Sequence, residues 1–434
     1  MLLIKNAVIV DPATEGGECG DGMFKRDILI EDGMIRRISP RIEETETVNA
    51  EVINAEGLKA GPGLVDVHVH FRDPGFTYKE DIHTGAAAAA AGGYTSVVMM
   101  ANTAPAIDNP ETLSYVLEKA AETDIHVYAC ATITEGLKGQ KLVDMEGLFE
   151  RGAVGFTDDG IPLMDEQLVK EAMLRASALN VPLSFHEEDP AYIVNNGIHA
   201  GSASEYFGIG GSDRMAEISL IRRDSELALL TGAIYDCQHI STKEGVELIR
   251  QAKRRAVTAK KGRIHAEATP HHFSLTQNAL IEHGTLAKMN PPLRTEEDRM
   301  AVIQGLADGT IDLIATDHAP HSSEEKARAL TEAPSGIIGL ETAFSLAVTH
   351  LVREGHLSLK TLFDRMSMAP AGLYHLPGGR IAEGTVADLV LFDDTKEVVY
   401  ESFCSKSENS PFTGQKLFGS VEMTICSGRV VYRK

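Results

Sequence analysis

The chain has 434 residues, 43% of them hydrophobic and 24% charged, which is the composition of an ordinary globular protein and not of a disordered or fibrous chain. Its formal net charge of −22 argues against nucleic acid and against an anionic membrane as partners, because both bind basic surfaces. The chain is longer than the chains that usually fold around one hydrophobic core, so we expect one large domain and a second, smaller one.

The N-terminus and the cysteines bear on the cellular compartment. The apolar run over the first ten residues is broken by Lys5 and Asn6 and is too short for a secretory signal. The cysteines are odd in number, widely spaced and without a CxxC motif: Cys19, Cys130, Cys237, Cys404 and Cys426. This usage is typical of a reducing compartment and argues against a cysteine metal site, so we expect a cytoplasmic protein.

Both ends of the chain show short alternating runs punctuated by glycine, aspartate and proline. In the N-terminal part they predict small antiparallel strands at 2–10, 27–30 and 34–38. The C-terminal part repeats the pattern at 388–392, 397–400, 421–425 and 429–432. We therefore expect residues 1–60 and 375–434 to form one small β-sandwich domain together.

The middle of the chain, residues 61–374, alternates short apolar runs with windows of helical periodicity. Eight runs predict strands, at 64–70, 95–101, 126–133, 153–159, 182–187, 233–240, 263–269 and 312–318. Helices are expected at 77–91, 164–178, 215–230, 243–256 and 296–307. Strands alternating with helices imply right-handed crossovers and a parallel sheet, and eight repeats favour an α/β fold of the closed (β/α)₈ TIM barrel type.

The first of these strands ends in two histidines spaced two residues apart. Period-2 geometry places His68 and His70 on the same face of the strand, where two imidazoles can bind one metal ion. The alternative is a pair of half-buried, hydrogen-bonded histidines. Which interpretation holds depends on the polar residues at the other strand ends.

Barrel enzymes carry their chemistry on the loops that follow the strands, so the polar residue closing each apolar run is a candidate. These residues are His68 and His70, Asp158 and Asp159, His186, His239, and Asp317. Each one alone could be a hydrogen-bonded loop residue. Imidazole and carboxylate ligands together suit zinc or another first-row divalent ion, and a shared carboxylate can hold two ions.

Such a site predicts metal-assisted hydrolysis of an amide-like bond. Two ions that share a water lower its pKa and polarise a carbonyl group. A carboxylate such as Asp317 can accept the proton of the water and pass it to the leaving nitrogen.

Seven motifs together resemble the bacterial dihydroorotases of the amidohydrolase superfamily. They are PGLVDVHVHFRDPG, NTAP, GFTDDG, FHEE, HIST, NPPLR and ATDHAPH, and the resemblance covers essentially the whole chain. It implies a metal-dependent (β/α)₈ barrel that catalyses the reversible cyclisation of N-carbamoyl-L-aspartate to L-dihydroorotate and water in pyrimidine biosynthesis. A metal-bridging hydroxide would be the nucleophile, and Asp317 the general acid and base.

The resemblance also implies a ligand set for two zinc ions. His68, His70, Asp159 and Asp317 would hold one ion, and Asp159, His186 and His239 the other. Many relatives bridge their ions with a lysine on strand four, but this chain has none there and matches the branch that bridges with aspartate. In that branch the second aspartate of the motif is the bridge, which favours Asp159, while Asp158 could cap a turn.

For the substrate carboxylate, the resemblance implies a site made of Arg72, Asn102 and His321 beside His70. Arg72 offers a planar, permanently charged fork that suits a carboxylate. Asn290 and the backbone of Ser335 and Gly336 would hold the amide edges of the ring. Alternatively, Arg72 pairs with Asp73, and the two asparagines are turn residues near proline.

Some features depart from the family pattern or lie beside it. Ala101 replaces the usual proline before Asn102, and His271 and His272 are expected to be packing or supporting residues because the family gives them no metal role. Residues 322–330 are polar and follow Asp317 and His321, and we hypothesise that they form a mobile lid that orders over the substrate. Proteolytic cleavage there that substrate does not slow would contradict this.

Two other functions stay open at this point. One is another cyclic amidohydrolase, a hydantoinase, dihydropyrimidinase or allantoinase, which would lack the carboxylate site built on Arg72. The other is a non-catalytic partner of aspartate transcarbamoylase, although such chains typically lose metal ligands. The resemblance further implies a homodimer and a possible association with aspartate transcarbamoylase.

Overall fold

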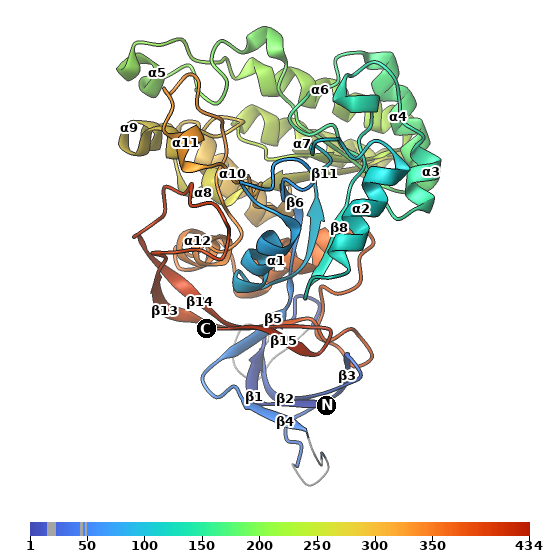
Figure 1. Cartoon of the computed structure of the whole chain (residues 1–434), viewed down its shortest axis with the longest axis vertical. Coiled ribbons are helices and arrows are strands. Elements are labelled where there is room, and N and C mark those ends of the chain that lie inside the picture. The colour runs from blue at the N-terminus through green and yellow to red at the C-terminus, as the bar shows by residue number, and fades with distance from the viewer. Residues whose placement is uncertain (15–22, 44–46, 48–49) are drawn as a thin grey trace.

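The computed structural model of the chain describes residues 1–14, 23–43, 47 and 50–434, so Cys19 lies outside the described part. A large domain of helices around strands lies above a smaller β domain, which contains both chain ends (Figure 1). Within the described residues, no helix is both long enough and apolar enough to span a membrane.

The large domain is a closed parallel barrel, as predicted. Its strands are β6 (Leu64–Val69), β7 (Tyr94–Met99), β8 (His126–Ala129), β9 (Pro182–Phe185), β10 (Ile234–Cys237), β11 (Arg263–Ala268) and β12 (Leu313–Ile314). They form two parallel sheets in the orders β6-β7-β8 and β12-β11-β10-β9. Single parallel bridges, Ala131 to Phe156, Phe156 to Leu183 and Val69 to His318, join the two sheets into a ring.

The fourth predicted strand, 153–159, was only partly right. The run occupies the expected place between β8 and β9, but only Phe156 pairs with both neighbours. Phe156 donates its backbone N–H to Pro182 O at 3.1 Å, and Ser184 donates to Phe156 O at 3.0 Å. Pro182 has no N–H to donate, which limits the ladder on this side.

Helices cover the outside of the barrel in the alternation that the sequence predicts. The longer ones are α1 (Ile82–Ala91), α2 (Pro110–Ala120), α4 (Glu166–Leu179), α6 (Met215–Thr231), α7 (Lys243–Ala259) and α10 (Glu296–Asp308). The shorter ones are α3 (Met145–Glu150), α5 (Ser202–Phe207), α8 (Pro270–Ser274), α9 (Asn278–His283), α11 (Ser323–Lys326), α12 (Ala343–Ala347), α13 (Leu359–Phe363) and α14 (Ala369–Leu373). The helix expected over 77–91 begins only at Ile82, because Asp81 and Thr84 form a capping box.

The β domain combines both ends of the chain in one sheet. Its strands are β1 (Leu2–Ile9), β2 (Phe24–Glu31), β3 (Met34–Ser39), β4 (Glu51–Asn54), β5 (Lys59–Pro62), β13 (Leu389–Val399), β14 (Lys416–Cys426) and β15 (Arg429–Arg433). Their order is β15-β14-β13-β5-β1-β2-β3, with β4 also paired to β1, and the antiparallel pair β5 and β13 joins the two ends.

Three details of this domain differ from the prediction, and the first is that strands β4 and β5 were not expected. The sheet is mixed and not purely antiparallel, because β1 runs parallel to β4 and β5. The two strands expected at 388–392 and 397–400 form the single strand β13, which has an irregular register between Asp393 and Glu397. The sheet curls over its own core, since Ile35 N bonds to Thr385 O at 2.9 Å, just before β13.

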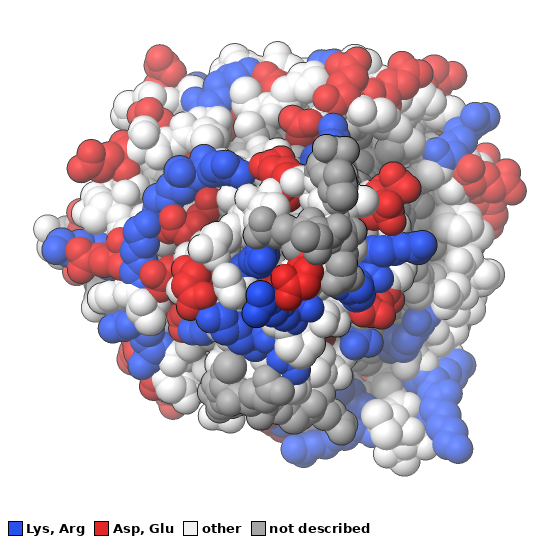
Figure 2. Space-filling model, turned by 90° about the horizontal axis from the view of Figure 1, so that it is seen from below, with Lys and Arg blue, Asp and Glu red and all other residues white. Residues whose placement is uncertain are grey.

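The end of the molecule formed by the β domain carries charges of both signs. Figure 2 shows Lys and Arg interspersed with Asp and Glu on this face. Mixed charge of this kind is typical of a solvated surface.

Candidate active site

The carboxyl ends of the barrel strands surround a cavity of about 200 Å³. It is lined by His70, Arg72, Asn102, Asp159, Gly160, His186, His239, Asn290, Asp317, Ala319, His321, Ser335 and Gly336. All the site residues expected from the sequence line it except His68, which is fully buried beside Asp159. The barrel thus brings together side chains that are up to 268 positions apart, from His68 to Gly336.

One group of candidate ligands comes from the first and last strands. His70 Nε2 lies 3.0 Å from Asp317 Oδ1, and His68 Nε2 lies 3.5 Å from the same oxygen. The parallel bridge between Val69 and His318 sets this approach, because it joins the two strand ends directly. The three side chains could hold one cation.

Asp159 lies between this group and a second pair of histidines. Its Oδ1 is 3.4 Å from His68 Nε2 and 3.9 Å from both His186 Nδ1 and His239 Nε2, while its Oδ2 is 3.4 Å from His70 Nε2. One carboxylate therefore faces four imidazoles. This is the arrangement required of a ligand shared by two ions.

Asp158, the other candidate, points elsewhere. Its Oδ1 accepts hydrogen bonds from Ile133 N at 2.7 Å and Thr134 N at 3.1 Å, and its Oδ2 bonds to the Thr134 hydroxyl. Burial raises the pKa of Asp158 to about 6 despite these bonds. Asp158 closes the loop after β8, and only Asp159 reaches the histidines.

Buried acidic residues orient the histidines from behind. His68 Nδ1 lies 2.8 Å from Glu267 Oε2, and His186 Nε2 lies 3.2 Å from Glu188 Oε2. Such pairs fix the ring orientation of a metal-binding histidine and increase its basicity. Neither glutamate was predicted from the sequence, although a charged residue inside the apolar run of β11 was a usable signal for Glu267.

The donor set fits divalent cations. His68 Nε2 is buried without a hydrogen-bond partner, although it faces two carboxylates. Burial and the neighbouring histidines His186 and His68 hold the pKa of His239 well below its usual value, so the His239 ring is neutral and keeps a lone pair for a ligand bond. Nitrogen and oxygen donors in this mixture are typical of zinc and related ions.

Arg72 belongs to the cavity and not to a surface ion pair. Its possible partner Asp73 is engaged by Lys119 Nζ and by the Tyr115 hydroxyl, each at 2.8 Å. Three residues of the site have a positive φ, which is uncommon for residues other than glycine: Arg72 at 61°, His239 at 34° and Asp317 at 49°. Backbone strain of this kind is often found at functional sites.

His321 is held as a neutral ring at the cavity wall. Its Nε2 lies 2.8 Å from Ser335 O and its Nδ1 lies 3.4 Å from Lys79 Nζ. Burial, with the cations Arg72, Lys79 and Lys326 nearby, lowers the pKa of His321 to about 2. Its hydrogen bonding therefore does not change with pH near neutrality.

Two further histidines lie behind the site. His272 Nε2 is 3.0 Å from Pro291 O and its Nδ1 is 2.7 Å from the Thr269 hydroxyl, so the ring supports the loop that carries Asn290. His271 is buried beside it. Neither residue lines the cavity.

A segment of the C-terminal part of the chain reaches the barrel mouth and was missed by sequence reasoning. Asn409, buried between β13 and β14, donates from Nδ2 to Ala319 O and to Gly336 O, each at 3.1 Å, and accepts at Oδ1 from His321 N at 3.0 Å. Asn409 thereby connects the start of the loop, at Ala319 and His321, to its end at Gly336. About 90 residues separate Asn409 from His321, so no spacing pattern connects them.

The segment expected to form a lid is partly anchored. Residues 323–326 form α11, which Ser322 caps, and the buried Lys326 donates from Nζ to Pro334 O at 3.0 Å and to Gly336 O at 3.1 Å. Glu325 contacts Lys79 at 2.9 Å and the Tyr78 hydroxyl at 3.0 Å. Movement of this segment stays a prediction.

Sequence comparisons find close relatives. A family model described as Dihydro-orotase-like matches residues 60–245. The dihydroorotase of Clostridioides difficile is 51% identical over 432 residues and covers 100% of both chains. The dihydroorotase of Clostridium acetobutylicum is 50% identical, with 100% of this chain and 99% of the relative covered.

Solved structures with the same fold include other cyclic amidohydrolases. An L-hydantoinase (dihydropyrimidinase) from Arthrobacter aurescens matches with a TM-score of 0.86 and 25% identity, and the match covers 100% of this chain and 96% of the other. The dihydropyrimidinase of Brevibacillus agri matches with a TM-score of 0.84 and 22% identity, covering 100% and 95%.

The geometry predicts different effects for the two neighbouring aspartates. Changes to residues that only support metal ligands cost roughly 10- to 100-fold in metal affinity, so loss of the shared carboxylate in Asp159→Asn should cost more than that. Asp158→Asn is the matched control and should keep the metal. Elemental analysis of the purified proteins after dialysis measures the difference, and equal metal contents in the two variants would contradict the arrangement.

Proposed function

Because the chain belongs to the dihydroorotase family of metal-dependent cyclic amidohydrolases, we propose that its barrel mouth interconverts N-carbamoyl-L-aspartate and L-dihydroorotate in pyrimidine biosynthesis. The observation that carries this proposal is the guanidinium of Arg72 in the same small cavity as the histidine and aspartate cluster. The cavity thus offers both a set of donor atoms that can hold cations beside an amide carbonyl and a fixed positive charge for an anionic substituent.

We assign two zinc ions to the cluster. His68, His70 and Asp317 would hold the first ion, His186 and His239 the second, and Asp159 both. When bound, the ions lower the pKa of a shared water and polarise the ring carbonyl. The buried, unpartnered Nε2 of His68 and the neutral ring of His239 support this assignment.

Asp317 has the position expected of the proton carrier. It lines the cavity next to His70, at the end of the last barrel strand. In the hydrolytic direction, a water oxygen bonds to the ring carbonyl carbon, Asp317 accepts the proton of the water, and the ring nitrogen takes up that proton as its bond to the carbon breaks. In the cyclising direction the same transfers run in reverse.

Arg72, Asn102 and His321 are proposed to bind the carboxylate beside His70. Asn102 is already oriented, because its Oδ1 lies 2.9 Å from His70 Nδ1 and its Nδ2 donates to Asp159 Oδ2 at 3.2 Å. The low pKa of His321 supports a role as a neutral hydrogen-bonding group that needs no protonation change on binding.

Asn290 and the backbone of Ser335 and Gly336 are proposed to hold the ring. Asn290 Oδ1 is buried without a partner beside His186, so an N–H group of the substrate would satisfy it. A side chain at position 336 would meet Ala319 Cβ at 2.8 Å and His321 Nε2 at 3.1 Å. Glycine at 336 therefore leaves both the packing and the cavity intact.

The alternative functions fit this geometry less well. A hydantoinase or a related amidohydrolase acts on uncharged rings, so its cavity does not require a guanidinium group such as that of Arg72. The relatives at about 50% identity are also named dihydroorotases. A non-catalytic partner of aspartate transcarbamoylase does not require a complete set of metal ligands.

The resemblance to bacterial dihydroorotases also gives expectations about assembly and location. We expect a homodimer, and association with aspartate transcarbamoylase is possible; sedimentation of the protein alone and with that enzyme would measure both. The cysteines at 130, 237, 404 and 426 are all unpaired, which supports a reducing cytoplasm.

Asp317→Asn should nearly abolish turnover. A general acid and base contributes typically 10²- to 10⁴-fold, and this change also weakens a ligand, so we expect kcat to fall by more than about a thousandfold. Dihydroorotate hydrolysis and metal content are measured on the same sample. Near-normal kcat with the metal retained would remove Asp317 from the mechanism.

Arg72→Met should separate carboxylate recognition from ring chemistry. Loss of a charge-assisted hydrogen bond costs about 1.5–3 kcal/mol, so kcat/KM for dihydroorotate should fall roughly 10- to 100-fold. Hydrolysis of dihydrouracil, the same ring without a carboxylate, should not fall. Arg72→Lys is the charge-conserving control, and an equal loss for both substrates in Arg72→Met would contradict the assignment.

Asn409→Ala should act on binding more than on chemistry. It removes three hydrogen bonds that hold the loop of His321 and Gly336, so KM for dihydroorotate should rise about tenfold while kcat changes less than about threefold. Ser407→Ala is the control on the same segment, because its hydroxyl bonds to Lys79 O and not to that loop. Equal effects of the two changes would indicate general loosening of the segment.

A further inference from the structure

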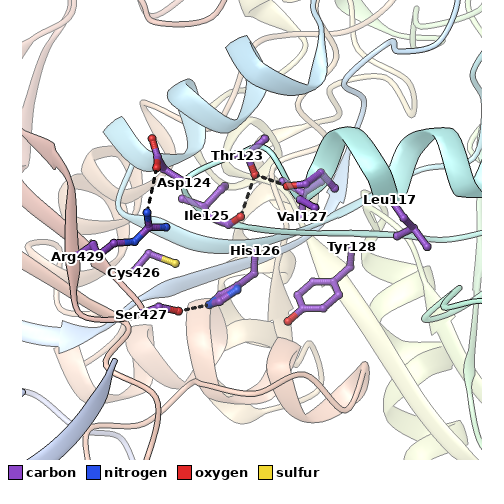
Figure 3. Close-up of a pocket in the computed structure, with 12 residues that line it drawn as sticks. Leu117, Thr123, Asp124, Ile125, His126, Val127, Tyr128, Cys426, Ser427 and Arg429 are labelled. Atoms are coloured by element: carbon purple, nitrogen blue, oxygen red, sulfur yellow. Dashed lines mark hydrogen bonds and ion pairs between the residues drawn. The ribbon is translucent and has the colours of Figure 1, made fainter. Parts of the chain in front are cut away.

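A second cavity lies between the barrel and the β domain, away from the mouth. It has a volume of about 370 Å³ and is lined by the amino end of β8, the end of α2 and the turn between β14 and β15 (Figure 3). The described residues of this cavity include His126, Cys426 and Ser427, none of which takes part in the site at the mouth.

Three different donor atoms converge at the edge of this cavity. His126 Nε2 lies 3.1 Å from Asp388 Oδ2, and the ligand atoms of His126, Asp388 and Cys426 all lie within 4.8 Å of one another. Figure 3 shows the sulfur of Cys426 and the ring of His126 side by side. His126 begins β8, Asp388 directly precedes β13 and Cys426 ends β14, so the cluster exists only where the two domains meet.

Neighbouring groups hydrogen-bond to all three donor side chains, since Ser427 Oγ lies 3.4 Å from His126 Nε2 and Cys426 Sγ lies 3.7 Å from Thr95 O. Asp388 Oδ1 accepts from Ser427 N at 2.8 Å, which fixes the carboxylate with Oδ2 toward His126. Asp388 and Cys426 are buried, with exposed fractions of 2% each, while His126 is half-buried beside the cavity. Hydrogen bonds that orient a ligand from behind are a regular feature of metal sites.

We propose that His126, Asp388 and Cys426 form a separate site for one divalent zinc-like cation, bound through the imidazole Nε2, the carboxylate and the thiolate, with the fourth position open to the cavity. Ions with bonds of about 2.0–2.3 Å in a tetrahedron hold their ligand atoms roughly 3.4–3.6 Å apart, so the cluster needs only side-chain rotation to close on an ion.

The charges and protons of this site balance. A thiolate and a carboxylate together offset the two positive charges of the ion. Burial and the nearby Asp388 carboxylate raise the pKa of the Cys426 thiol, so Cys426 is a thiol before binding and loses its proton to solvent when the sulfur–metal bond forms. The nearest cationic side chain on the turn, Arg429, is directed to Asp124 at 3.7 Å.

Cobalt(II) distinguishes this site from the one at the mouth. The mouth offers only nitrogen and oxygen donors, so a thiolate-to-cobalt charge-transfer band in the near ultraviolet can arise only at a cysteine. The metal-free full-length protein is titrated with Co²⁺ beyond the capacity of the mouth. We expect the band to appear, to be lost in Cys426→Ser, and to persist in the control Cys404→Ser, whose cysteine is exposed.

Two further readouts keep the test decisive. Dihydroorotate turnover and far-ultraviolet circular dichroism should be unchanged in Cys426→Ser, because the residue is remote from the mouth. If Cys426→Ser does not fold, His126→Gln on the half-buried ligand should weaken Co²⁺ binding at the thiolate band at least tenfold. A cobalt-saturated protein without the band, or a band that survives Cys426→Ser, would overturn the proposal.

Discussion

The active site depends on one buried carboxylate that faces four imidazoles. Asp159 has an exposed fraction of 5%, and a charge in that position is stable only beside compensating partners. Those partners come from three other strands, at His68, His70, His186 and His239. The strands that carry these five residues must therefore keep their register for this one contact to form.

The β domain contributes to the mouth through the segment between its two longest strands. Besides Asn409, this segment places the Ser405 hydroxyl and Lys406 N on the buried Glu80, which also lies 3.4 Å from His318 Nε2. The loops after the first and the eighth barrel strands are thus bound to a common third element. Substrate recognition, which uses residues of both loops, rests on contacts made outside the barrel.

Local sequence patterns predicted most of the strands, helices and site residues. The features they missed depend on contacts between residues far apart in the sequence. The apolar runs that end in His68, His186, His239 and Asp317 located the site, because strand-end position is a local property. Local patterns could not show that Pro182 would weaken the fourth strand or that β13 would be continuous. They also could not pair Glu267 with His68, which is about 200 residues away, or find Asn409, whose partner His321 is about 90 residues away.

The antiparallel pair of β5 and β13 has a consequence for how the chain is completed. β5 ends at Pro62 and its partner strand begins at Leu389. During synthesis, the edge of β5 that pairs with β13 therefore stays unpaired while more than three hundred further residues are made. The barrel lies entirely within that interval. The segment that carries Asn409 emerges only after β13, so residues made after the whole barrel connect Ala319 and His321 to Gly336 at the mouth. A chain cut short before residue 389 would contain every barrel strand but would lack the partner of β5 and the Asn409 contacts at the mouth.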